Sequence, residues 1–169
     1  MVVVADTSPL NYLVLIGEIG LLPKLYRRVV VPQAVMDELK HPGAPEPVTE
    51  FAANPPDWLE TAATEMPTAG SITGIMADLD AGEIAAITLA ASHPDSLLLM
   101  DEIAGRAEAS RLGIRSTGTL GILRDAANAG FVELSSAFQK LQTTTFRLPA
   151  SVIAELLAED ALRKGRLRD

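Results

Sequence analysis

Three short stretches of the chain are almost entirely aliphatic, and none of them alternates with polar positions. They are VVVA at 2–5, VVVP at 29–32 and LLLM at 97–100. Such a run is typical of a strand buried on both faces, as in a parallel sheet. Helical patterns lie between and after the runs. The order of elements therefore predicts an α/β sandwich of three layers, with a mainly parallel sheet of four to five strands.

The helical segments carry recognisable start and stop signals. Residues 8–26 predict two helical pieces divided near Gly17–Gly20, and Pro32 suits the first position of a helix that runs to about Leu39. Residues 41–77 hold six of the eleven prolines, and we expect one short helix and an edge strand there, near 58–62. The later pattern predicts helices over 80–92 and 103–112, then a short strand and a helix that ends at Gly130. The last forty residues predict two amphipathic helices. The second has an apolar stripe of Val152, Ile153, Leu156 and Leu157.

Composition places the chain among globular proteins, with 48% hydrophobic and 21% charged residues. The absence of cysteine excludes disulfides and thiolate metal sites and fits a reducing compartment. The opening MVVVAD does not resemble a signal peptide, and no apolar run reaches the roughly 18 residues of a membrane helix. We therefore expect a cytoplasmic protein without a membrane partner.

Several carboxylates fall where ligands bind in a parallel sheet, beyond the carboxyl ends of the strands. Asp6 directly follows VVVA, and Asp101 and Glu102 directly follow LLLM. Helical spacing turns Glu38 toward the sheet, and it turns Glu83 onto the buried face of its helix. Each acid also has a structural explanation. Asp80 and Glu83, for example, match a capping box at the start of a helix.

Taken together, Asp6, Glu38, Glu83 and Asp101 would converge at one end of the sheet. Clustered carboxylates repel one another unless a cation intervenes, and Mg²⁺ and Mn²⁺ prefer oxygen ligands. Such a site supports metal-assisted phosphodiester hydrolysis. Catalysis by a nucleophile and a histidine has little support, because cysteine is absent and both histidines, His41 and His93, lie in segments beside prolines.

Four blocks of the sequence resemble the acidic blocks of PIN-domain nucleases, in the same order. They are VVVADTSPLNYL, VVVPQAVMDEL, LDAGEIAAITLA and LLLMDEIAGRAEASRLGI, and their forms are similar to a subgroup close to VapC-type toxins. The similarity spans about residues 2–133. It implies a nuclease domain over 1–133, with the helices of 134–169 packed on the same domain and a basic tail at 163–169.

The resemblance also implies a function and a set of site residues. We expect a Mg²⁺- or Mn²⁺-dependent endoribonuclease, often dimeric and frequently the toxin of a toxin–antitoxin pair. Asp6, Glu38, Glu83 and Asp101 match the acidic positions, and Ser8 matches a polar residue that helps to orient the first aspartate or a metal-bound water. Many relatives would align Glu102 with the last acid, so both Asp101 and Glu102 are candidates for the metal beside Asp6 and Glu83, with Asp101 preferred.

The charge distribution bears on the RNA substrate. The net charge is −8, and no lysine or arginine lies between Lys40 and Arg106, where half of the 22 acids fall. This balance argues against simple electrostatic binding of nucleic acid. The cations best placed to guide an RNA backbone are Lys24, Arg27, Arg28, Arg106 and Arg111.

Two other functions compete with the nuclease. One is a binding or assembly module that keeps the fold without catalysis, which the acidic surface and the apolar C-terminal helix favour. The other is a metal-dependent phosphatase. It is weaker, because Ser8 stands where the nucleophile pattern needs a second aspartate two residues after Asp6.

Overall fold

The computed structural model describes residues 1–64 and 78–166. The chain divides into two compact units, Met1–Thr119 and Leu120–Asp169. The division into a nuclease domain over 1–133 and C-terminal helices over 134–169 on the same domain stays a prediction. Residues 65–77 of the expected irregular segment, and residues 167–169 of the basic tail, lie outside the described residues.

The first unit is built on a five-stranded sheet whose neighbouring strands are all parallel. The sheet order is β3-β2-β1-β4-β5, so β1 is the central strand. Val4 lies in register with Val30 on one side and with Leu98 on the other. The strands are β1 Val2–Ala5, β2 Val29–Pro32, β3 Leu59–Ala62, β4 Ser96–Leu99 and β5 Arg115–Thr117. The predicted α/β sandwich with a parallel sheet is confirmed.

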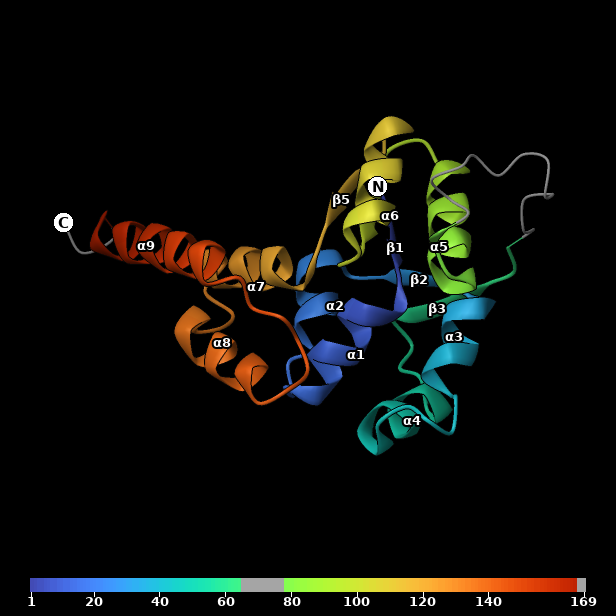
Figure 1. Ribbon diagram of the computed structural model, residues 1–169, viewed down its shortest axis with the longest axis horizontal. Coiled ribbons are helices and arrows are strands. Elements are labelled where there is room, and N and C mark those ends of the chain that lie inside the picture. The colour runs from blue at the N-terminus through green and yellow to red at the C-terminus, as the bar shows by residue number, and fades with distance from the viewer. Residues whose placement is uncertain (65–77, 167–169) are drawn as a thin grey trace. The chain divides into compact units, whose positions relative to one another are not determined.

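Helices cover both faces of this sheet. Figure 1 shows α5 and α6 on one side of the sheet and α1 and α2 on the other. The side chains of Val4, Leu98 and Met100 pack with Ile84 and Ile87 of α5 in one buried cluster. The helices of this unit are α1 Thr7–Leu15, α2 Leu21–Tyr26, α3 Gln33–Leu39, α4 Glu46–Ala53, α5 Ala81–Ala91 and α6 Ile103–Arg111, and α7 Thr119–Asn128 begins at its last residue.

Several element boundaries differ by one or two residues from the sequence prediction, and two of them depend on the sheet. Pro32 is not the first helical residue of α3. It has an extended backbone, with φ −62° and ψ 155°, and it pairs with Ala62 at the end of β2. The strand predicted over 97–100 begins at Ser96 and ends at Leu99. In both places sheet pairing, which no local pattern encodes, decides the boundary.

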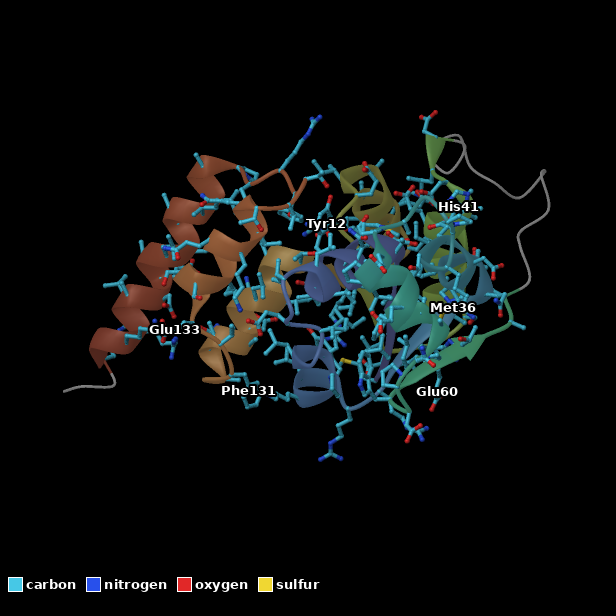
Figure 2. All side chains as sticks on the ribbon, turned by 90° about the horizontal axis from the view of Figure 1, so that it is seen from below. Tyr12, Met36, His41, Glu60, Phe131 and Glu133 are labelled. Atoms are coloured by element: carbon cyan, nitrogen blue, oxygen red, sulfur yellow. The ribbon has the colours of Figure 1, made fainter. Side chains whose placement is uncertain are left out.

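The second unit contains α8 Leu134–Gln142 and α9 Ala150–Arg166. The predicted apolar stripe of α9 is not buried, because Val152 is exposed and Ile153, Leu156 and Leu157 are half-buried. The buried residue of α9 is Asp160, which binds Arg163 and Lys164 at 2.7 and 2.8 Å. Lys164 also contacts Glu133 at 2.7 Å, and Figure 2 shows Glu133 beside α9. Among the described residues, no helix is long and apolar enough to cross a membrane.

Candidate functional site

Asp6 occupies the position immediately after the central strand β1. Its amide nitrogen donates to the carbonyl oxygen of Leu99 at 2.9 Å, which extends the β1–β4 pairing by one residue. The side chain is only 2% exposed, and its Oδ1 atom is buried without a hydrogen-bond partner. An unpaired buried carboxylate oxygen is costly, so a ligand for this atom is expected.

The electrostatic surroundings of Asp6 are acidic. Burial raises the pKa of Asp6 to about 7, and the backbone of Thr7 opposes this shift with a hydrogen bond. The negative charges of Glu83, Asp80 and Glu38 contribute to this rise as smaller causes than burial. Acids from α3 and from the start of α5 therefore share the environment of Asp6, as the sequence predicted for Glu38 and Glu83.

Glu83 lies in the first turn of α5, where it takes part in the predicted capping box. The amide of Glu83 donates to Asp80 Oδ1 at 2.8 Å, and the amide of Asp80 donates to Glu83 Oε2 at 2.9 Å. Burial raises the pKa of Glu83, the bond from the Asp80 amide lowers it, and the charges of Asp80, Glu102 and Glu38 raise it again. Glu83 thus belongs both to the helix cap and to the acidic cluster.

Glu38 lies on the half-buried side of α3, whereas its neighbour Asp37 is exposed and accepts a hydrogen bond from Gln33 at 2.7 Å. The Glu38 carboxylate accepts hydrogen bonds from two other elements. Gly82 donates its amide to Oε1 at 3.1 Å, and the Thr7 hydroxyl donates to Oε2. Both carboxylate oxygens of Glu38 therefore have protein partners. Ser8, the predicted supporting residue, lies half-buried in the first turn of α1.

Asp101 and Glu102 are adjacent after β4, yet their side chains have different partners. The Asp101 carboxylate accepts hydrogen bonds from the amide and the hydroxyl of Thr119, both at 2.7 Å. Burial raises the pKa of Asp101, while Thr119 and the charge of Arg106 lower it. Glu102 is exposed and caps α6, and its charge acts on Glu83. Of these two acids, Glu102 is the one whose charge reaches the acidic cluster through Glu83.

The described side chains do not form a ready-made metal cage. Across residues 1–64 and 78–166, no group of three or more His, Asp or Glu side chains is arranged to hold a metal ion. The orphaned Oδ1 of Asp6 and the neighbouring carboxylates nevertheless fit a hard cation, since Mg²⁺ uses few protein ligands and keeps several waters. The residues present therefore suit a divalent ion held largely by water.

The structure distinguishes the five predicted RNA-binding cations. Arg111 forms two hydrogen bonds, of 2.8 and 2.6 Å, to the fully buried Glu108. Arg28 pairs with Glu60 of β3 at 2.5 Å, and Figure 2 labels Glu60 on that strand. All five cations are exposed, Lys24, Arg27 and Arg106 included. Arg28 and Arg111 thus already have acidic partners.

Sequence reasoning missed the residues that orient the carboxylates. Thr119 binds Asp101, and Gly82 binds Glu38. A Cβ atom at Gly82 would lie 2.6 Å from Glu38 Oε1, and one at Gly118 would lie 2.7 Å from Asp101 Oδ1. In the sequence, Gly82 stands beside Glu83 and Gly118 stands beside Thr119. Neither position indicates that the glycine lies against a distant carboxylate.

Comparison with known protein families identifies the family of this chain. A protein-family model described as a PIN domain matches residues 2–161, nearly the whole chain. Comparisons with curated proteins and with solved structures find no match. PIN domains are generally nucleases and usually use divalent metals. The parallel sheet, the acids at its edge and the match over residues 2–161 together show that this chain belongs to the PIN-domain family.

Proposed function

We propose that this chain is a Mg²⁺- or Mn²⁺-dependent endoribonuclease. The observation that supports it best is the buried Asp6 carboxylate, which has one unpaired oxygen and whose pKa is raised to about 7 by burial and by the acids around it. A divalent cation would balance these charges and satisfy the orphaned oxygen. Membership of the PIN-domain family supports hydrolysis of a phosphodiester bond.

Asp6, Glu83 and Glu102 are the residues that we propose to hold the ion. When bound, the ion would supply a nucleophilic hydroxide near neutral pH and charge stabilisation for the leaving oxygen. Asp6 provides a rigid anchor, because its backbone is bonded to Leu99. Glu83 is oriented by its capping partner Asp80. Asp101, the acid that sequence reasoning preferred, instead binds Thr119, the first residue of α7, through two hydrogen bonds.

The RNA backbone is proposed to be guided by exposed cations outside the acidic cluster. Arg106 lies on α6, one turn after Glu102, and its charge acts on Asp101. Arg106 is therefore the cation best placed to meet a phosphate near the acids. Lys24 on α2 and Arg27 directly after it are further candidates, and both are exposed.

Cleavage of single-stranded RNA with Mn²⁺ or Mg²⁺ tests the proposal. We expect cleavage that EDTA abolishes and that falls at least about 100-fold in Asp6→Asn and in Glu83→Gln. Asp37→Asn, an exposed carboxylate on α3, is the matched control and should retain wild-type activity. Cleavage in EDTA, or equal rates for Asp6→Asn and wild type, would contradict the proposal.

A second comparison separates Asp101 from Glu102. Mn²⁺ affinity, measured by calorimetry, should fall at least about tenfold in Glu102→Gln, because one ligand is lost. Asp101→Asn should change affinity less and stability more, because its partner is the buried Thr119. The reverse order would restore Asp101 as the ligand.

We also propose that the nuclease acts as the toxin of a toxin–antitoxin pair, with an antitoxin protein as partner and a homodimer as the working form. Expression in a host cell should arrest growth, and Asp6→Asn should not. Equal growth with both proteins would reject the toxin role without affecting the nuclease assay. If the folded protein cleaves no RNA, a non-catalytic binding module becomes the better proposal, since α9 exposes Val152 and Leu162.

A further inference from the structure

Three helices meet at the Glu38 carboxylate. Gly82, in the first turn of α5, donates its amide to Oε1 at 3.1 Å, and Thr7, at the start of α1, donates its hydroxyl to Oε2. Glu38 itself lies on α3. These contacts connect residues that are 44 and 31 positions apart in the chain. We refer to Thr7, Glu38 and Gly82 as the Glu38 clamp.

The clamp is closely packed at Gly82. A Cβ atom there would lie 2.6 and 2.7 Å from the two Glu38 carboxylate oxygens, and 2.8 Å from Cδ. Real Cβ atoms do not approach other atoms so closely. Gly82 is helical and its φ lies outside the left-handed region, so backbone conformation does not require glycine at this position. An added methyl group would instead meet the Glu38 carboxylate, which would have to move away from it.

The clamp residues are chain neighbours of the two central acids. Thr7 directly follows Asp6, and Gly82 directly precedes Glu83. Glu38 therefore bridges the side chain of the residue beside Asp6 to the backbone of the residue beside Glu83. Because both of its oxygens already accept hydrogen bonds from the protein, its carboxylate is oriented toward the helices that it joins.

We propose that Glu38 is a positioning residue, which sets the spacing of Asp6 and Glu83 through the hydrogen bonds of the clamp. This inference rests on the proposed metal-dependent function of that site. It assigns Glu38 a role through its acceptor geometry, in place of the direct catalytic role that the sequence predicts. Holding ligands within about 0.5 Å of the working geometry is what supporting residues of a metal site supply.

Two substitutions of Glu38 separate geometry from charge. Glutamine keeps an oxygen for the Gly82 amide, and its Nε2 can donate to the Thr7 hydroxyl, so Glu38→Gln preserves the clamp without the charge. Glu38→Ala removes both bonds. We expect Mn²⁺ affinity, measured by electron paramagnetic resonance, to fall at least about tenfold in Glu38→Ala and to stay within about threefold of wild type in Glu38→Gln.

Amide hydrogen exchange reports the clamp independently of metal and RNA. The Gly82 amide should exchange faster in Glu38→Ala than in wild type, and Glu38→Gln should restore slow exchange. Gly82→Ala should weaken Mn²⁺ binding as Glu38→Ala does, because its methyl group displaces the carboxylate. Gly20→Ala is the matched control, since Gly20 has φ −66° and no atom lies within 4 Å of an added Cβ. If Glu38→Ala does not fold, Thr7→Val removes one bond of the clamp and takes its place.

The outcomes distinguish this inference from the proposed function. If Glu38→Gln loses as much Mn²⁺ affinity as Glu38→Ala while Gly82 exchange stays slow, Glu38 acts through its charge and the inference is overturned. Wild-type protein that does not bind Mn²⁺ overturns it too. If affinities follow the expected order but no variant cleaves RNA, the clamp stands and the nuclease proposal fails.

Discussion

The carboxylate of Asp101 binds Thr119 twice, through the amide and through the hydroxyl, at 2.7 Å each. Thr119 is fully buried at the start of α7, and Asp101 follows β4, so the two bonds connect residues 18 positions apart. Bonds to a charged acceptor in a buried place are among the stronger ones in proteins. This pair explains why an acid beside the candidate site has a structural role.

Thr119→Val should therefore destabilise the protein. Loss of the hydroxyl leaves Asp101 Oδ2 without its bond, and we expect a decrease of about 1–3 kcal/mol in the free energy of unfolding. Urea denaturation at pH 7 measures it. Thr143→Val, which removes an exposed hydroxyl bonded to the Lys140 carbonyl, is the control and should cost less than about 0.5 kcal/mol. An equal loss of unfolding free energy in the two variants would contradict a stabilising bond between the Thr119 hydroxyl and Asp101.

Asp6 should make stability fall as pH rises. Its pKa is raised from 3.8 to about 7 by burial, so the folded state holds a proton that the unfolded state has lost. The contribution of Asp6 to the free energy of unfolding is fully present below pH 4. It is lost as the pH rises from 4 to 7, and the loss amounts to about 4 kcal/mol at most. In EDTA, Asp6→Asn should be more stable than wild type at pH 8, by thermal denaturation, and the difference should shrink toward pH 4. A constant difference between the two proteins would show that Asp6 does not titrate in this range.

Gly105→Ala should destabilise α6. A Cβ at Gly105 would overlap Sδ of Met100, and this methionine is fully buried among other core side chains. Overpacking of this kind costs about 1–3 kcal/mol. Gly165→Ala in α9 is the control, because no atom lies within 4 Å of its Cβ, and improved helix propensity should stabilise by up to about 1 kcal/mol. Opposite signs for the two substitutions, in urea denaturation, are the expected result.

Asp80 should stabilise α5 through its acceptor oxygen. Asp80→Ala removes the bond to the Glu83 amide and should cost about 1 kcal/mol in the free energy of unfolding. Asp80→Asn keeps an acceptor and should cost only a few tenths of a kcal/mol. The negative charge of Asp80 raises the pKa of Asp6, so both variants should lower that pKa. A loss in Asp80→Asn as large as in Asp80→Ala would show that the charge stabilises the helix.

The strands and the capping box could be predicted because their signals are local. VVVA and VVVP are strands over their full predicted length, and Asp80 and Glu83 form both bonds of the predicted box. The partners of the other acids could not be predicted. Glu38 and Gly82 are 44 residues apart, and only the packing of α3 against α5 brings them together. Asp101 and Glu102 are indistinguishable by position, and contact with Thr119 separates them.

By itself, the sequence determined the order of strands and helices, the parallel sheet and the placement of acids at its edge, because hydrophobic runs and capping residues act over a few positions. Only the tertiary structure decided how each carboxylate is used. Asp6 is left buried with an unpaired oxygen, Glu38 joins three helices, and Asp101 binds Thr119. Desolvation and hydrogen bonding depend on which distant surfaces meet, and that information lies in the packing of the elements.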